Sequence, residues 1–419
     1  MTKYRIRGGQ RLSGDLRIQG AKNAALPILA AAILTEGKNE IHNVPHIADV
    51  LETLEILKNI GCRAELKNNT VTIDFSDELQ HKIPDELAQK MRSSILFVGA
   101  MLGRMGKVEI AMPGGCKLGE RAIDLHIDGL KAMGAEIVEE SGKLFCSTDG
   151  LKGAHIKLHT ASVGATENLI LAAVKAEGQT IIENAACEPE IADLAKFLIS
   201  CGAKIMGAGT GTGMIIIEGV KTLRPKMPHT VMPDRIVAGT YLLAAAMTGG
   251  SVTLHDVYPN DLMPITSVLA KMGCVIHTGR KCVTLAAPER LKAVAKIITD
   301  AHPGFPTDLQ PQLTAALAIA KGTSEINERI FESRYAHCEG LNKMGANINV
   351  SACNRIFVVH GRDALQGAEV TATDLRCGAA LVLAGLVAEG ETVVDGAEYI
   401  QRGYVDMAGD LGSLGADVV

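Results

Sequence analysis

Two glycine markers recur together six times in this sequence, and they constrain its fold more than any other feature. The first marker is a Gly followed by Ala or Cys after an amphipathic stretch, at Gly61, Gly134, Gly202, Gly273, Gly345 and Gly415. The second is a Gly that follows an apolar stretch, at Gly37, Gly106, Gly178, Gly250, Gly322 and Gly390. Successive markers of each set lie 68 to 73 residues apart. A fixed period of this kind indicates one supersecondary unit repeated along the chain. The sequence therefore predicts six α/β units.

Each unit is expected to hold an apolar helix, a strand, an amphipathic helix and further strands, with glycines in the left-handed conformation at the helix ends. The stretches 24–34 and 236–247 are apolar on every face, which predicts helices enclosed on all sides. One amphipathic stretch carries a single apolar stripe, at Leu51, Leu54 and Leu57. We therefore expect buried central helices wrapped by strands and outer helices, with the six units divided into two lobes of three.

The two ends of the chain indicate where the lobes divide. Residues 1 to about 20 have a strand pattern before the first buried helix, and the sixth unit ends at Val419. A fold of six units then predicts that these first strands complete the lobe formed by the last three units. The basic, proline-containing stretch 221–228 has the composition of a linker. We therefore predict one discontinuous lobe of residues 1–20 plus 230–419, and one continuous lobe of residues 21–229.

Polar or capping residues stand at the start of every apolar helix, at 22–23, 92–94, 166–167, 233–235, 307–308 and 373–374. The free N–H groups and the dipole of a helix N-terminus attract anions. If the buried helices of a lobe lie parallel, their N-termini meet at one end, and two such ends would form a phosphate-binding cleft. The alternative is that each cluster only caps its own helix.

Composition and motifs exclude several classes of function. With 42 Lys and Arg against 47 Asp and Glu, the net charge is -5, whereas nucleic-acid-binding proteins are usually strongly basic. No apolar run approaches the ~20 residues that cross a bilayer, and no signal-peptide core follows the first residues. Ten scattered cysteines without a CxxC pair fit a reducing compartment. No metal or nucleotide-cofactor motif is present. We therefore expect a cytoplasmic protein with no cofactor, no membrane and no nucleic-acid partner.

The segment 113–121 combines a lone cysteine, Cys116, with three glycines and two cations. Access and nearby positive charge lower the pKa of a thiol and make it reactive. The flanking glycines also predict a lid that closes over a substrate, and the alternative is an ordinary flexible turn. Cys62 and Cys274, by contrast, occupy a marker position that holds Ala in sibling units, which indicates packing.

Cations also gather near the predicted helix starts. Lys22 begins a predicted buried helix. Burying its ammonium group costs free energy unless a negatively charged group lies next to it. Arginines lie near such starts or in loops between units, at Arg92, Arg121, Arg334, Arg376 and Arg402. Each alone fits a surface ion pair, but together they suit a substrate with several negative charges. Asp308 fits either a helix cap or a general base.

Several longer segments resemble the enolpyruvyl transferases, and most closely those members that act on UDP-N-acetylglucosamine. These segments are 20–27, 113–116, 121–126, 162–168, 305–308, 373–376 and 402–404, and the resemblance covers essentially the whole chain. It implies a two-lobed inside-out α/β barrel of six units. It also implies transfer of the enolpyruvyl group of phosphoenolpyruvate to the 3'-hydroxyl of UDP-N-acetylglucosamine, with release of phosphate. The implied path is addition and elimination through a tetrahedral ketal, without metal or organic cofactor, in the first committed step of peptidoglycan synthesis.

The resemblance also implies roles for individual residues. Lys22, Arg121 and Arg402 would hold the phosphate and carboxylate of phosphoenolpyruvate. Cys116 would act as general acid or in product release and would be alkylated by fosfomycin, and Asp308 would be the base near the 3'-hydroxyl. The residues implied to line the sugar-nucleotide site are Asn23, Arg92, Ala122, Ile123, Asp124, Leu125, Ser162, Val163, Gly164 and Ile330. The residues implied to lie nearby are Glu188, His302, Arg334 and Arg376.

The sequence departs from the common family pattern at Ala122, Thr160 and Cys377. These departures would weaken or alter contacts to the nucleotide, whereas the residues implied to react are all present. Two alternatives stay open. One is an idle paralogue that binds a UDP-sugar, which we would expect to have lost Lys22, Cys116, Asp308 or Arg402. The other is transfer to a different acceptor, such as another nucleotide sugar or shikimate phosphate. No oligomeric state follows from the sequence.

Overall fold

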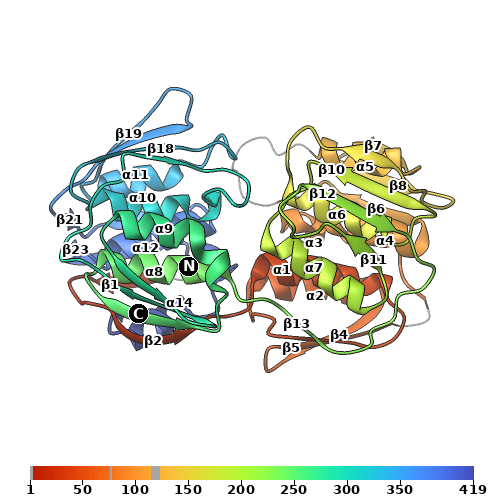
Figure 1. The fold of residues 1–419 in the computed structure, drawn as a ribbon, viewed down its shortest axis with the longest axis horizontal. Helices are drawn as coiled ribbons and strands as arrows, with labels where there is room; N and C mark the ends of the chain where they lie inside the picture. Colours follow the sequence, from red (N-terminus) through yellow and green to blue (C-terminus); the bar gives the residue numbers. More distant parts are fainter. Residues whose placement is uncertain (1–2, 76–77, 115–122) are drawn as a thin grey trace. The chain divides into compact units, whose positions relative to one another are not determined.

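The computed structural model describes residues 3–75, 78–114 and 123–419, and these residues form a mixed α/β fold (Figure 1). The chain divides into two compact units. The first unit holds the chain up to Gln19 together with Pro233–Val419, and the second holds the described residues from Gly20 to Met232. Each unit has its own cluster of buried apolar side chains, so each has a hydrophobic core.

The second unit consists of short strands and helices in alternation. Its elements are α1 (Lys22–Ala31), η1 (Ala32–Leu34), β3 (Asn39–His42), α2 (Ala48–Asn59), β4 (Cys62–Lys67), β5 (Thr70–Phe75), α3 (Asp85–Ala88), η2 (Arg92–Ile95), α4 (Leu96–Met105), β6 (Lys107–Ala111), α5 (Asp124–Ala132), β7 (Glu136–Glu140), β8 (Lys143–Ser147), β9 (His155–Lys157), α6 (Val163–Ala173), β10 (Gln179–Glu183), α7 (Pro189–Ser200), β11 (Lys204–Met206), β12 (Met214–Glu218) and β13 (His229–Thr230).

The first unit contains the first two strands of the chain and everything after the second unit. Its elements are β1 (Lys3–Arg7), β2 (Ser13–Arg17), α8 (Arg235–Met247), β14 (Ser251–His255), η3 (Pro259–Leu262), α9 (Met263–Lys271), β15 (Val275–Thr278), β16 (Cys282–Ala286), β17 (Lys296–Ile298), η4 (Thr307–Leu309), α10 (Gln310–Ala318), β18 (Thr323–Asn327), α11 (Ala336–Lys343), β19 (Asn347–Val350), β20 (Ile356–His360), β21 (Leu365–Gln366), β22 (Glu369–Thr371), α12 (Leu375–Gly385), β23 (Ala388–Glu389), β24 (Glu391–Asp395), α13 (Ala397–Ile400), α14 (Met407–Ser413) and β25 (Asp417–Val418).

The sheets share a strand pattern. The four-stranded sheets have the orders β13-β3-β5-β4, β11-β12-β10-β9, β15-β16-β14-β2, β17-β18-β20-β19 and β22-β24-β1-β25. In each, the strand that follows a buried helix has one parallel and one antiparallel neighbour, as β18 has in β17 and β20. A three-stranded sheet β6-β8-β7 and a pair β21-β23 complete the set among the described residues. These sheets are open, and the described strands close no barrel, so the barrel arrangement stays a prediction.

The central helices are buried as predicted. Residues 24–34 lie in α1 and η1 with every side chain buried, and all of α8 from Ile236 to Met247 is buried. The predicted apolar stripe of α2 was wrong at one position, because Leu51 is 39% exposed. Val50, Leu54 and Leu57 form the buried face instead. Their spacing of four and three residues follows the 3.6-residue turn, whereas a spacing of three and three drifts off that face.

The glycine markers mostly take the predicted conformation. All six Gly-Ala or Gly-Cys glycines have positive φ, from 89° to 108°. In the other set Gly250 is the exception, and its neighbour Gly249 takes φ 66° in its place. A side chain at Gly250 would place its Cβ 2.1 Å from the carbonyl oxygen of Leu12, so this glycine permits a close backbone approach. One helix start also differed from its prediction, because α6 begins at Val163 with Ser162 as N-cap, a turn before residues 166–167.

Candidate active site

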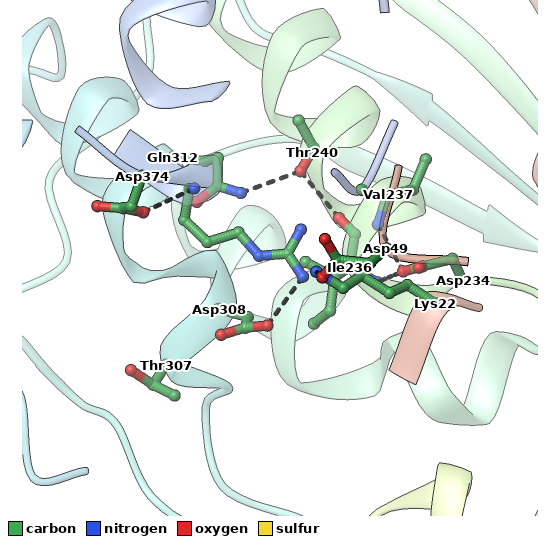
Figure 2. A network of polar contacts seen from close by, with 12 residues as sticks. Lys22, Asp49, Asp234, Ile236, Val237, Thr240, Thr307, Asp308, Gln312 and Asp374 are labelled. Carbon is green, nitrogen blue, oxygen red and sulfur yellow. Dashed lines mark hydrogen bonds and ion pairs between the residues drawn. The ribbon is translucent and has the colours of Figure 1, made fainter. Parts of the chain in front are cut away.

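Asp308 lies at the centre of a group of charged residues in the first unit. It is in η4, next to Thr307, and both residues are labelled in Figure 2. Its carboxylate accepts hydrogen bonds from Nη1 of Arg334 and Nη2 of Arg376, both at 2.8 Å. Both arginine side chains are 5% exposed and that of Asp308 is 24% exposed. The structure therefore brings together three residues that the resemblance placed at the site, although Arg376 is 68 residues from Asp308 in the chain.

The two guanidinium groups determine the charge of Asp308. Burial alone would raise the pKa of this carboxyl group, but Arg376 and Arg334 outweigh burial and hold the pKa well below its usual value. Burial in turn lowers the pKa of Arg376, and the attraction of Asp308 more than offsets this, so that pKa is raised. Asp308 is therefore ionised at neutral pH, but it binds a proton only weakly. Asp308 is therefore a weak base as long as both arginine contacts are present.

A second set of contacts holds Arg334 in place. Its Nη1 also donates to Oγ1 of Thr307 at 3.0 Å, and its guanidinium lies 4.7 Å from the ring centroid of Phe331. The Thr307 hydroxyl donates to Oε2 of Glu328 at 2.9 Å. Oε1 of Glu328 accepts from the backbone N–H groups of Ile330 and Phe331 at 2.8 and 3.1 Å. Sequence reasoning missed Glu328, because one glutamate in a charged stretch carries no local sign of burial.

The starts of three buried helices lie together in this unit. Asp234 caps α8 and Asp374 caps α12, each accepting two backbone N–H bonds. Arg376 is close enough to Asp234 and Asp308 for both carboxylates to raise its pKa. Helices α8, α10 and α12 also contact one another. Within this unit the helix N-termini therefore converge, and Figure 2 labels Asp234, Asp308 and Asp374 at these helix starts.

A buried polar network supports these helix starts. The hydroxyl groups of Thr240 and Tyr404 are 2.8 Å apart, and Nε2 of Gln312 donates to Thr240 at 3.2 Å. Thr240 is on α8, Gln312 is on α10, and Tyr404 follows α13. Nη1 of Arg376 is buried and has no hydrogen-bond partner among the described residues. One donor of this arginine thus remains available for a ligand.

The turn that carries Arg402 is held by a residue from the beginning of the chain. Nε2 of Gln19 donates to the carbonyl of Gly403 at 3.0 Å, and the N–H of Val405 donates to Oε1 of Gln19 at 2.9 Å. The backbone carbonyl of Gln19 also accepts from the N–H of Asp234 at 2.9 Å. Gln19 therefore fixes the Arg402 turn, and no sequence pattern had singled it out.

Lys22 is the first residue of α1 in the second unit. Its Nζ is 2.7 Å from Oδ2 of Asp49 on α2, and the two side chains are 13% and 7% exposed (Figure 2). The sequence predicted that a buried lysine at this position requires a negatively charged group next to it. Asp49 is such an anion, and its distance in the chain kept it out of the sequence-based set. Asn23, the next residue, is half-buried.

The sugar-nucleotide residues predicted in the second unit cluster at the starts of three helices. Arg92 begins η2 before α4, Ile123 precedes α5, and Ser162 caps α6 with its hydroxyl accepting from Ala165 N–H. Asp124 and Leu125 begin α5, and Val163 and Gly164 begin α6. The ring of His126 joins two of these starts, because a Cβ built at Gly164 would lie 3.4 Å from it.

His126 is neutral at physiological pH. Burial, followed by the nearby charge of Arg92, lowers its pKa to about 4. Its Nδ1 lies 3.1 Å from Nδ2 of Asn168, whose Oδ1 accepts the N–H of Gly99 at 2.8 Å. Because the amide nitrogen can only donate, Nδ1 of His126 is the acceptor. Asn168 thus connects α4, α5 and α6, the helices at whose starts the predicted nucleotide residues lie.

The remaining predicted residues are scattered. Glu188 precedes α7 and lies near Glu167, whose pKa is raised well above its usual value by burial and then by Glu190 and Glu188. His302 is half-buried, and Ile330 is 39% exposed next to Glu328. Cys116, Arg121 and Ala122 lie outside the described residues. Cys377 is buried in α12, and burial raises its pKa to about 11.

In residues 3–75, 78–114 and 123–419, no group of three or more His, Cys, Asp or Glu side chains is arranged to hold a metal ion. None of the helices in the same ranges has the length and apolar character needed to cross a membrane.

Comparison with known proteins identifies the family. The family model of EPSP synthase (3-phosphoshikimate 1-carboxyvinyltransferase) matches residues 6–411. The solved enolpyruvyl transferase NikO from Streptomyces tendae is similar with a TM-score of 0.88 and 25% identity, over 100% of this chain and 98% of that one. The fold and this match define an enolpyruvyl transferase.

The curated relatives narrow this class. The chain is 50% identical to UDP-N-acetylglucosamine 1-carboxyvinyltransferase 2 of Caldanaerobacter subterraneus subsp. tengcongensis, over 100% of this chain and 99% of the relative. It is 49% identical to UDP-N-acetylglucosamine 1-carboxyvinyltransferase of Idiomarina loihiensis, with the same coverage. The chain belongs to the enolpyruvyl transferase family, on the branch of the UDP-N-acetylglucosamine 1-carboxyvinyltransferases.

Proposed function

We propose that this protein is an enzyme that transfers the enolpyruvyl group of phosphoenolpyruvate to the 3'-hydroxyl of UDP-N-acetylglucosamine and releases phosphate. The observation that carries the proposal is the identity of 46 to 50% to three enzymes of that name over the whole chain. The reaction is the first committed step of peptidoglycan synthesis. By that route the protein serves cell-wall formation, and with it cell shape and division.

The substrates carry a phosphate, a carboxylate and a diphosphate, so binding them requires several cations. We propose that Lys22, Arg121 and Arg402 hold phosphoenolpyruvate. Lys22 begins a buried helix, and Gln19 fixes the turn of Arg402, which supports these two roles. The sugar nucleotide would be bound by Asn23, Arg92, Ala122, Ile123, Asp124, Leu125, Ser162, Val163, Gly164 and Ile330, with Glu188, His302, Arg334 and Arg376 nearby. Several of these residues begin helices, where N–H groups favour phosphate.

The chemistry follows from the substrates. The 3'-oxygen attacks C2 of phosphoenolpyruvate while C3 takes up a proton, which gives a tetrahedral ketal. Loss of a C3 proton then expels phosphate and leaves the enolpyruvyl ether. Asp308 is our proposed base for the hydroxyl proton, and Cys116 our proposed general acid or product-release group. Cations next to the developing charges lower the barrier, and the proposal includes no metal or organic cofactor.

The proposal extends to the finer features expected from the sequence. These are an inside-out barrel arrangement of six units in lobes 1–20 plus 230–419 and 21–229, a cytoplasmic location, and alkylation of Cys116 by fosfomycin. The recurring strand pattern of the sheets supports the repeat. The cysteines of the described ranges are all free, as is usual for a reducing compartment.

Phosphate release measured with and without acceptor tests the function. We expect release from phosphoenolpyruvate only when UDP-N-acetylglucosamine is present, in a one-to-one ratio with a product heavier by one enolpyruvyl group. Release with shikimate 3-phosphate instead would point to the sister activity. No release with any acceptor would favour the idle paralogue, although Lys22, Cys116, Asp308 and Arg402 are all present.

A further inference from the structure

Glu328 is a fully buried carboxylate next to the Asp308 group. It is 0% exposed, and burying a charged group is costly unless hydrogen bonds compensate for the lost water. Three uncharged donors surround it: the Thr307 hydroxyl and the N–H groups of Ile330 and Phe331. A residue that serves packing alone would be apolar here, because a hydrophobic replacement is often no less stable than a buried charge. The contacts of Glu328 therefore call for a role beyond packing.

Both sets of contacts lead to the same arginine. One oxygen of Glu328 binds Thr307, whose hydroxyl accepts from Arg334. The other oxygen binds the N–H of Phe331, whose ring lies against the Arg334 guanidinium. Arg334 in turn holds Asp308. One carboxylate thus fixes the two surfaces between which Arg334 is held.

Glu328 also holds the backbone of Ile330. Its Oε1 accepts the Ile330 N–H at 2.8 Å, and the Ile330 side chain is 39% exposed on the turn after β18. Ile330 is one of the residues proposed for the sugar-nucleotide site. A single buried side chain therefore connects an acceptor-binding residue to the group that contains the proposed base.

We propose that Glu328 is a positioning residue for enolpyruvyl transfer, holding Arg334 and Ile330 in the geometry that Asp308 and the acceptor require. This inference rests on the proposed function. It adds to it that the turn 328–331 sets the alignment of base and acceptor, without Glu328 touching either substrate. Misplacement by about 1 Å can cost roughly 100-fold in rate, so a contact network of this kind should be visible in kinetics.

Two substitutions remove the same hydrogen bond, the one between the Thr307 hydroxyl and Glu328, each by changing a different partner. Glu328→Gln keeps an oxygen for the two N–H groups but replaces the acceptor of the Thr307 hydroxyl. Thr307→Val removes that hydroxyl. We expect each to lower kcat by about 10-fold or more while the KM for phosphoenolpyruvate changes little. Because both act on one link, the double variant should be no slower than the slower single variant. Glu328→Ala, which also frees the turn, should in addition raise the KM for UDP-N-acetylglucosamine.

Glu325→Gln is the matched control, because Glu325 lies on β18 and pairs with Lys296 at a 38% exposed position. It should leave kcat and KM unchanged. Thermal unfolding of every variant separates misfolding from misalignment. Multiplicative effects of Glu328→Gln and Thr307→Val, or an unchanged kcat in Glu328→Gln, would overturn the inference. The unaltered protein is assayed first: its inactivity would refute the proposed function, whereas its activity with a fully active Glu328→Gln would refute only the role of Glu328.

Discussion

Replacing Asp308 by Asn tests the charge arrangement at the centre of the candidate site. Asp308 accepts two hydrogen bonds from charged donors, Arg334 and Arg376, both at 2.8 Å. The asparagine keeps one side-chain oxygen, which can still accept one of these bonds. Its NH₂ group cannot accept a hydrogen bond from a guanidinium group, so the variant loses the negative charge and one of the two hydrogen bonds. Two arginines that are 5% exposed then lose the carboxylate that they share. We therefore expect a less stable first unit and a slower enzyme.

The size of the effect follows from the exposure of the three side chains. Removing one partner of a buried ion pair costs about 3–5 kcal/mol. Because Asp308 is 24% exposed, water takes up part of the loss, and we expect about 2–3 kcal/mol. A unit of about 200 residues shifts its Tm by about 2–4 °C per kcal/mol. The transition of the first unit should therefore fall by about 4–12 °C. In addition, kcat should fall by about 100-fold or more, as expected on loss of a general base.

The pH dependence provides a second readout. The pKa of Asp308 is depressed in the folded protein, so its contribution to stability is fully present above the unfolded carboxyl value of about 3.9. This contribution is lost as the pH falls through the lower folded value. Calorimetry should therefore show a constant difference between the two proteins from pH 5 to 7, and a narrowing difference below about pH 4.

Asp363→Asn is the control for this experiment, because Asp363 pairs with Arg290 at 2.6 Å but is 91% exposed. An exposed pair of this kind contributes little, so its Tm should not change measurably. The reasoning is refuted if Asp308→Asn melts together with the unaltered protein at pH 7, or if the difference between them widens on acidification.

Three further predictions concern other parts of the chain. Fosfomycin should add to Cys116 alone, as peptide mapping would show, and an adduct elsewhere or none would contradict the expected reactive loop. A native thiol-labelling assay should modify the exposed Cys353, whose pKa is lowered by a hydrogen bond from Ser351. The same assay should spare the thiols whose pKa burial raises to about 11 or 12, at Cys62, Cys146, Cys274 and Cys338; their labelling at the rate of Cys353 would refute it. Gln19→Ala should raise the KM for phosphoenolpyruvate roughly 10-fold by releasing the Arg402 turn, whereas Gln366→Ala on the surface should not, and equal KM values would remove Gln19 from this role.

The features that could be predicted from the sequence are those governed by local patterns. An all-apolar stretch such as 24–34 must be enclosed, because no face of it can meet water. A glycine after an amphipathic helix marks a left-handed residue, and all six such markers behave in this way. The error at Leu51 arose because spacing of three residues alone does not follow the helical turn.

Side-chain partners could not be predicted in the same way, because tertiary folding makes them. Gln19 contacts Gly403 across 384 residues of chain, and Arg376 contacts Asp308 across 68. Lys22 illustrates the limit: physical reasoning required an anion near it, but only the folded chain identifies that anion as Asp49. Cations and carboxylates are recognisable as types in a sequence, whereas their pairing depends on which helices pack together.

The pairing changes what can be concluded about the proposed base. A carboxylate held by two guanidinium groups is too weakly basic to remove a hydroxyl proton while both contacts persist. Arginine, however, binds the phosphate or carboxylate group of a ligand as readily as it binds aspartate. An anionic substrate near Arg334 or Arg376 would therefore compete with Asp308 for the hydrogen bonds of these two arginines. Each arginine contact that turned from Asp308 to a substrate would raise the pKa of Asp308 and make it a stronger base. Substrate binding and base activation would then be one event, and the buried Nη1 of Arg376, which has no hydrogen-bond partner in the described chain, is a donor with which that competition can begin.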